Sequence, residues 1–167
     1  MVIFTGTALL PFLAVSNHDI CSIPASRADN QFMPAVLVLE DDPCVSTTLC
    51  TVLTLAGFTP HPARTVDDAL AILETERVDA VSLDMCVPDP KGLERSGLSL
   101  LTILRTMPDH ASLPAVIFTG QPLSIEEEDA ARNLHAQVIY KPESYTVIVD
   151  YLNRQLQRRR VPARLGN

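Results

Sequence analysis

Two patterns of apolar and polar positions alternate along the chain from Ala35 onwards. Short continuous apolar runs are typical of buried strands, and they are separated by segments whose apolar residues recur every three or four positions, as in amphipathic helices. The predicted strands cover residues 35–39, 58–62, 80–83, 115–118 and 138–140. Strand and helix therefore alternate five times, which predicts a parallel sheet with helices on both faces and right-handed crossovers.

The ends of the helices carry recognisable signals. We expect Asp42 to cap the first helix and Gly57 to end it. Thr65 is placed to cap the second helix, and Ser124 with Glu127 forms a capping box for the fourth. These signals fix where the predicted helices begin.

Within the helices, spacing predicts which residues face the core. The inward positions are expected to be Leu98, Leu101, Ile103 and Leu104 in the third helix, and Val147, Ile148, Tyr151 and Leu152 in the fifth. Two prolines in the second strand, Pro60 and Pro62, place that strand at an edge of the sheet, because proline has no N–H for a central ladder.

Composition narrows the class of protein. The 167 residues suggest one domain, and 47% apolar residues are enough for a sizeable core. A net charge of −7 disfavours nucleic-acid binding by the domain as a whole. The four cysteines show no metal-ligand spacing, which indicates free thiols in a reducing compartment, so we expect a cytoplasmic protein.

The two ends of the chain differ from its centre. Residues 1–34 are expected to form an N-terminal extension that is poorly ordered or peripheral; a leader, an extra strand and an over-called start codon are all open interpretations. Its apolar start is too short to span a bilayer, and no basic residue precedes Arg27. Residues 159–167 form a basic tail, either a solvated helix end or a contact for an acidic partner.

Polar side chains follow four of the predicted strands: Glu40 with Asp41, Asp84, Thr119 and Lys141. The carboxyl ends of parallel strands meet at one edge of a sheet, where such folds place their chemistry. Carboxylates brought together there repel each other unless a cation joins them, and an oxygen-only ligand set suits Mg²⁺. The same set could accept a phosphoryl group on a carboxylate and stabilise its transfer.

Four segments, VLVLEDDP, SLDMCVP, AVIFTG and VIYKP, occur in this order and at intervals that resemble the receiver domain of bacterial two-component response regulators, of the single-domain, chemotaxis-regulator-like kind. The resemblance covers residues 35–158. It implies a flavodoxin-like, doubly wound α/β fold with a five-stranded parallel sheet in the order 2-1-3-4-5 and five helices.

The resemblance also implies a role for each strand-end residue. Asp84 corresponds to the phosphoacceptor, Thr119 to the switch hydroxyl and Lys141 to the lysine that pairs with the phosphate. The implied Mg²⁺ ligands are Glu40, Asp41, Asp84 and the backbone carbonyl of Cys86.

The sequence departs from the family pattern at two places. Receivers usually carry Tyr or Phe three residues before the lysine, whereas this chain has Val138 there and Tyr140 next to Lys141. The usual aromatic relay is therefore in doubt. The loop from Pro88 to Gly97 is also longer than usual, and we align Gly97 with the family's glycine because the third helix follows it.

These features predict a signalling switch that receives a phosphoryl group from a sensor histidine kinase or a histidine phosphotransfer protein. We expect it to act on a downstream protein target, with no direct DNA binding and no membrane span. It is not expected to be a dedicated enzyme beyond self-phosphorylation from a donor and autodephosphorylation.

Three other classes of protein make different demands on the same residues. A degenerate receiver that binds proteins without phosphorylation is the alternative, kept open by Val138. An aspartyl-phosphate hydrolase of the haloacid dehalogenase type would need a second Asp where this chain has Cys86. A nucleotide-binding flavodoxin-like protein would need a glycine-rich loop after the first strand.

Overall fold

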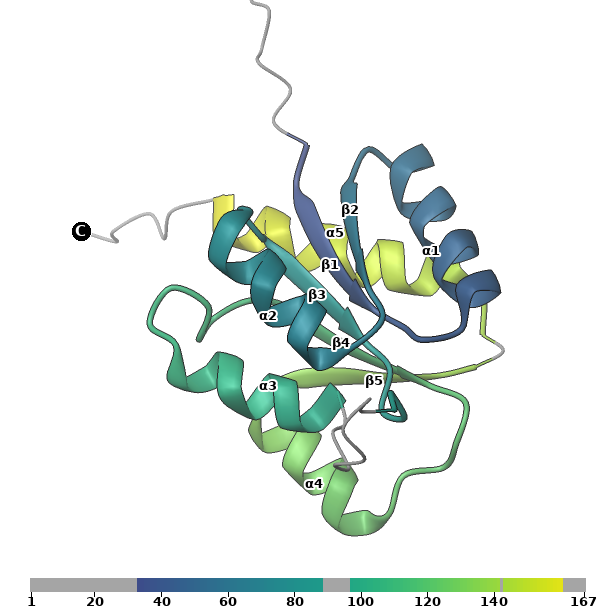
Figure 1. Cartoon of the computed structure of the whole chain (residues 1–167), viewed down its shortest axis with the longest axis vertical. Helices are drawn as coiled ribbons and strands as arrows, with labels where there is room; N and C mark the ends of the chain where they lie inside the picture. Colours follow the sequence, from purple (N-terminus) through teal and green to yellow (C-terminus); the bar gives the residue numbers. More distant parts are fainter. Residues whose placement is uncertain (1–32, 89–96, 142, 161–167) are drawn as a thin grey trace, which may run out of the picture. The chain divides into compact units, whose positions relative to one another are not determined.

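The computed structural model describes residues 33–88, 97–141 and 143–160 (Figure 1). In this part of the chain, strands and helices alternate five times, as the sequence predicts. The elements in order are β1 (Ala35–Leu39), α1 (Pro43–Leu55), β2 (Thr59–Ala63), α2 (Val66–Thr75), β3 (Ala80–Leu83), α3 (Gly97–Thr106), β4 (Ala115–Thr119), α4 (Ile125–Asn133), β5 (Ala136–Tyr140) and α5 (Tyr145–Arg160).

The five strands form one parallel sheet in the order β2-β1-β3-β4-β5. This confirms the predicted topology and the edge position of β2. The missing N–H groups of Pro60 and Pro62 are tolerated there because one side of an edge strand has no neighbouring strand to bond. β1 and β3 lie inside the sheet, and every residue of both strands is buried. The carboxyl ends of these two strands are therefore held by neighbours on both sides and by apolar cores on both faces.

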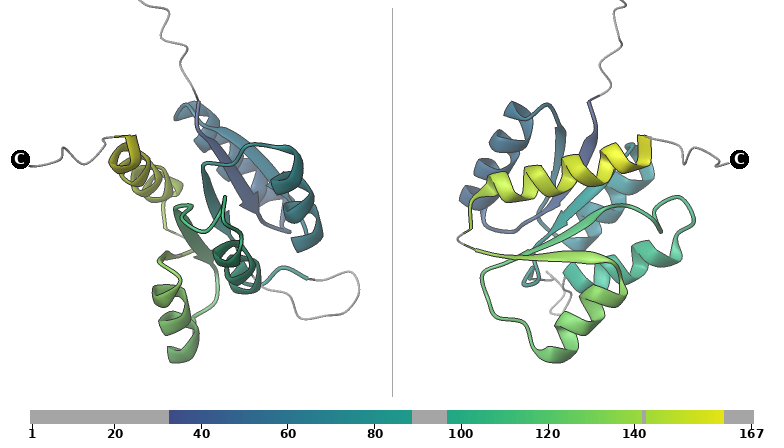
Figure 2. Two further views of the ribbon diagram at one scale, coloured as in Figure 1. Left: turned by 90° about the vertical axis from the view of Figure 1, so that its left-hand side faces the viewer. Right: turned by 180° about the vertical axis from the view of Figure 1, so that it is seen from behind.

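Helices cover both faces of the sheet (Figures 1 and 2). Leu37 and Leu39 of β1 pack in a core with α2, α3 and α4, whereas Val36 and Val38 pack in a second core with α1 and α5. Successive side chains of a strand point to opposite faces, so one continuous apolar run contributes side chains to both cores.

The predicted caps form as expected. The Asp42 carboxylate accepts hydrogen bonds from the backbone N–H groups of Cys44 at 2.7 Å and Val45 at 3.2 Å. Thr65 and Ser124 each begin a helix with a complete capping box. Gly57 follows α1 with a φ of 85°, in the left-handed region that ends helices and favours glycine.

Two predicted core positions are wrong. Ile103 of α3 and Val147 of α5 are 39% and 38% exposed. Leu101 and Leu104 of α3 and Ile148 and Leu152 of α5 are buried as predicted, and Leu100 and Val149 are buried beside them. Each helix presents only a narrow stripe to the sheet, so an apolar residue directly next to a buried one can point towards solvent.

The predicted extension, most of the basic tail and the long loop lie outside the described residues. α5 continues to Arg160, two residues into the stretch predicted as tail. In the part of the chain that the structure describes, no helix is both long and apolar enough to cross a bilayer. Cys44, Cys50 and Cys86 are free thiols, as expected.

Gly97 begins α3 directly against the end of β3. Its backbone N–H donates to the carbonyl oxygen of Asp84 at 3.0 Å. A Cβ at this position would clash with that same carbonyl oxygen and would lie 3.0 Å from the Cβ of Leu83. The close approach of α3 to Asp84 therefore requires glycine here.

We predict that Gly97→Ala lowers the free energy of unfolding by about 1–3 kcal/mol, the usual cost of overpacking a core site. Gly120→Ala is the matched control, because its Cβ would meet only the Cδ of Lys141 at 3.7 Å, an ordinary contact. Urea denaturation of both variants measures the difference. Equal stability of the two variants would contradict the assigned contact.

Candidate functional site

The polar residues predicted at the strand ends lie along one edge of the sheet. Glu40 directly follows β1, Asp84 follows β3, Thr119 is the last residue of β4, and Lys141 directly follows β5. The parallel register brings these ends together because all four strands run in the same direction.

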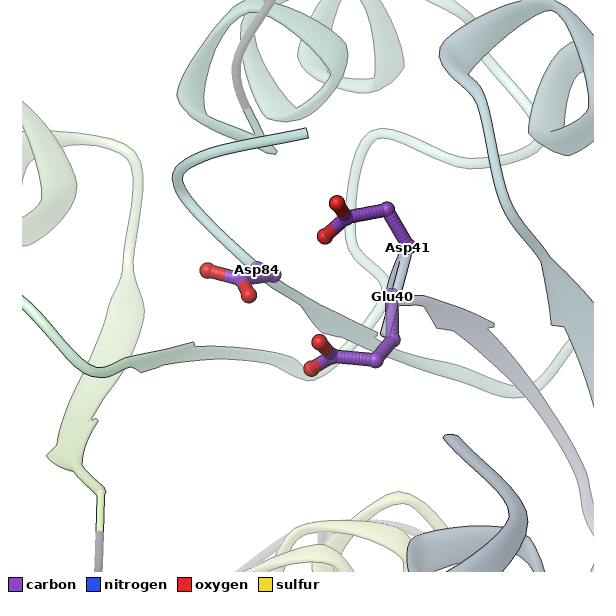
Figure 3. Close-up of side chains that lie close together, drawn as sticks. All are labelled: Glu40, Asp41 and Asp84. Carbon is purple, nitrogen blue, oxygen red and sulfur yellow. The ribbon is translucent and has the colours of Figure 1, made fainter. Parts of the chain in front are cut away.

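Three carboxylates form an acidic cluster at this edge: Glu40, Asp41 and Asp84. One carboxylate oxygen from each lies within 4.8 Å of the others. Glu40 is 2% exposed and Asp84 is 7% exposed, whereas Asp41 is half-buried. Figure 3 shows the three side chains directed into the same space from the ends of β1 and β3.

Lys141 joins two members of the cluster. Its Nζ lies 2.7 Å from Oε2 of Glu40 and 2.7 Å from Oδ2 of Asp84. It also lies 5.2 Å from the centre of the Phe118 ring, within range of a cation–π contact. Burial alone lowers the pKa of Lys141, but the hydrogen bonds to Asp84 and Glu40 outweigh it and raise the pKa, so the ammonium stays charged.

Burial raises the pKa of Glu40 to about 7. The hydrogen bond from Lys141 opposes this shift, and the negative charge of Asp84 adds to it. With all three acids ionised, the site carries three negative charges and one positive charge, a net of −2. A bound divalent cation would balance that charge and would favour the ionised form of Glu40.

Thr119 is fully buried, and among the described residues its hydroxyl bonds to Gln121 rather than to the acidic cluster. Its Oγ1 donates to the carbonyl oxygen of Gln121 at 3.3 Å and accepts from the Gln121 N–H at 3.2 Å. The backbone N–H of Cys86 donates to Oδ1 of Asp84 at 3.2 Å. The Cys86 backbone is therefore next to the cluster, while its side chain is exposed.

One contact near the site was not predicted. Tyr140 pairs with Thr119 across β4 and β5, and its hydroxyl donates to Oε1 of Glu128 on α4 at 2.8 Å. That hydrogen bond is the main reason that the pKa of Tyr140 is raised. The period of two along a strand places Val138 and Tyr140 on the same face, but the partner on α4 depends on how that helix lies against β5.

Comparison with known proteins decides the family. The family model described as "Response regulator receiver domain" matches residues 36–153. The chain belongs to the response regulator receiver family. Receiver domains act in the phosphorylation-dependent signalling of two-component systems, in which they interact with histidine kinases.

Two curated relatives are longer proteins than this chain. It is 29% identical to the nitrogen assimilation regulatory protein NtrX of Azorhizobium caulinodans, over 75% of this chain and 27% of the relative. It is also 29% identical to the phosphate regulon transcriptional regulatory protein PhoB of Klebsiella pneumoniae, over 74% of this chain and 52% of that protein. The receiver thus spans about a quarter to a half of these relatives' length.

Solved structures support the same fold. A CheY-like receiver domain protein from Methanospirillum hungatei superposes with a TM-score of 0.67 at 21% identity, covering 75% of this chain and 95% of that chain. The receiver domain of a signal transduction histidine kinase from Syntrophus aciditrophicus superposes with a TM-score of 0.67 at 21% sequence identity. The match covers 80% of this chain and 98% of that chain. These likenesses confirm the flavodoxin-like fold.

We predict that the carboxyl group of Glu40 titrates near pH 7 in the metal-free receiver, because the side chain is buried beside Asp84. Carbon-13 NMR of the side-chain carboxyls measures the midpoint, and Glu40→Gln identifies the resonance. A midpoint near the ordinary value of 4.5 would contradict the assigned environment.

The raised pKa of Glu40 also determines how the stability of the fold changes with pH. Because the folded-state pKa lies above 4.5, the folded form binds this proton more tightly, and that stabilisation is complete below pH 4.5 and lost as pH rises through about 7. The free energy of unfolding of wild type should therefore fall relative to Glu40→Gln across this window. A constant difference between the two proteins would contradict the shift.

Proposed function

We propose that Asp84 accepts a phosphoryl group from the phosphohistidine of a sensor kinase or phosphotransfer protein, with Mg²⁺ bound beside it, and that the receiver then signals to a protein target. The observation that carries this proposal is the acidic cluster of Glu40, Asp41 and Asp84 within 4.8 Å, with Lys141 bonded to two of its members. An ordinary structural ion pair would not need the third carboxylate.

The chemistry of the donors favours Mg²⁺. Asp41 and Asp84 offer carboxylate oxygens, the Cys86 carbonyl is the expected backbone ligand, and Glu40 adds negative charge beneath them. Hard oxygen donors with access to water suit Mg²⁺, which keeps several of its waters. When bound, the ion would offset the repulsion between these carboxylates and an incoming phosphoryl group.

The residues of the chain then have distinct tasks. A carboxylate oxygen of Asp84 attacks phosphorus, the P–N bond of the phosphohistidine breaks, and the imidazole leaves with the bonding electron pair. Lys141 already lies 2.7 Å from Asp84, so its ammonium is placed to pair with the phosphoryl oxygens. Thr119, at the end of the next strand, supplies a hydroxyl that can leave Gln121 and donate to the phosphoryl group.

We propose that the signal leaves through the face of α4, β5 and α5. Movement of Thr119 would open space beside its strand neighbour Tyr140, which is bonded to Glu128 of α4. This link joins β5 to α4 although Val138 occupies the usual aromatic position. Phosphorylation would then shift the population between two arrangements of this face.

We predict that wild type gains one phosphoryl group on incubation with Mg²⁺ and acetyl phosphate, and that Asp84→Asn does not. The substitution keeps the shape of the side chain and removes the nucleophilic oxygen charge. Intact-protein mass spectrometry measures the gain. If neither protein gained mass, the result would favour a degenerate receiver that binds partners without phosphorylation.

A second prediction tests the metal ligands. Asp41→Asn should weaken Mg²⁺ binding about tenfold, equivalent to about 1.4 kcal/mol, because one ligand charge is lost. Asp42→Asn is the matched control: it removes the same charge one residue away, and asparagine preserves the helix cap. Calorimetric titration with Mg²⁺ compares the variants, and equal weakening of both would exclude Asp41 as a specific ligand.

A further inference from the structure

A cavity lies at the opposite end of the sheet from the acidic cluster. We call it the basic pocket and define it by Arg105, Arg158 and Arg159, which line a hollow of about 410 Å³. The pocket also includes Pro114 and His135, which directly precede β4 and β5. β4 and β5 have five residues each and run from the pocket to the acidic edge of the sheet. At the usual rise per residue of a strand, the two sites are about 16 Å apart.

Three elements meet around the basic pocket. α3 begins beside Asp84 and ends at Thr106, and α5 begins after β5 and ends at Arg160, so both helices bring their C-terminal turns to this end of the sheet. Figures 1 and 2 show these two helix ends beside the loop that leads into β4.

The pocket concentrates positive charge in an acidic chain. The chain has a net charge of −7, yet none of the described residues that line this hollow carries a carboxylate. Burial lowers the pKa of Arg105; Tyr151 opposes this shift, and the neighbouring charge of Arg159 adds to it. A guanidinium stays protonated in proteins, so an anion bound here would offset the repulsion between these groups.

The half-buried Arg105 guanidinium is oriented by one hydrogen bond and keeps one donor without a partner among the described residues. Nε of Arg105 donates to the backbone carbonyl of Leu134 at 2.8 Å, which orients the group. Its Nη1 is enclosed and has no hydrogen-bond partner among the described residues. Arg159 is held by a hydrogen bond to the hydroxyl of Ser112. Buried donors in proteins are normally paired, so the free Nη1 points to an acceptor that binds here.

Apolar surface adjoins the charged groups. Leu113 and Pro114 are buried and Tyr151 is half-buried, and all three line the same hollow. Sites for small molecules combine apolar walls with a few placed polar groups and usually span 300–1,000 Å³ as a rough range. The basic pocket has both features.

We infer that the basic pocket binds a small phosphate monoester. The guanidinium groups of Arg105, Arg158 and Arg159 would bind the phosphate oxygens, because arginine matches phosphate in bidentate geometry. The organic part would pack against Leu113 and Tyr151. The site is separate from Asp84, so this inference does not depend on the proposed phosphotransfer.

The test uses adenosine monophosphate as the probe and the full chain labelled with nitrogen-15, at 0.15 M salt to screen non-specific attraction. We expect saturable NMR shift changes centred on residues 111–113, 134–135 and 155–159. Arg158→Gln should weaken binding about tenfold, equivalent to about 1.4 kcal/mol. Arg154→Gln, an exposed position on the same helix that does not line the pocket, should bind as wild type.

Three results would overturn the inference. Absence of saturable shifts would exclude the site, and equal weakening in both variants would reduce it to general charge attraction. Affinity for inorganic phosphate equal to that for adenosine monophosphate would remove the organic part of the assignment. Asp84→Asn should bind the probe as wild type, so a failure of phosphorylation and a failure of this site are distinguishable.

Discussion

Repulsion among three carboxylates is the constraint on which the acidic edge of the sheet depends. Glu40, Asp41 and Asp84 are held together although one ammonium, that of Lys141, contacts only two of them. Like charges so placed would separate in a flexible chain. They stay together because β1 and β3 are fully buried between two apolar cores, and because α3 approaches Asp84 through a glycine. The stability of the sheet thus holds these carboxylates in an arrangement that is suited to bind a cation and to accept a phosphoryl group.

Much of this was readable from the sequence, since it depends on local signals. The apolar runs predicted the strands, and the capping residues Asp42, Thr65 and Ser124 predicted where three of the helices begin. The parallel topology then required the carboxyl ends of the strands to meet at one edge. The helix faces were harder: Ile103 and Val147 are exposed because the sheet covers only part of each helix. The roles of the strand-end residues follow from chemistry and resemblance, and they stay predictions.

The contacts that sequence reasoning missed join distant segments. The hydrogen bond from Tyr140 to Glu128 depends on how α4 lies against β5, and that from Arg105 to Leu134 depends on the end of α3 reaching the turn before β5. Neither distance follows from periodicity or capping. The acidic cluster and the basic pocket lie at opposite ends of the sheet, a placement that composition alone does not reveal.

A crystal structure with Mg²⁺ and beryllium trifluoride, a stable mimic of a phosphoryl group, tests the central claim most directly. The account predicts the trifluoride on a carboxylate oxygen of Asp84, Mg²⁺ coordinated by Asp41 and Asp84, and the Lys141 ammonium against a fluorine atom. Such a structure would show that the crowded acidic edge is the phosphoacceptor site. An unmodified Asp84 with Lys141 still joining it to Glu40, in crystals that contain both reagents, would contradict that claim.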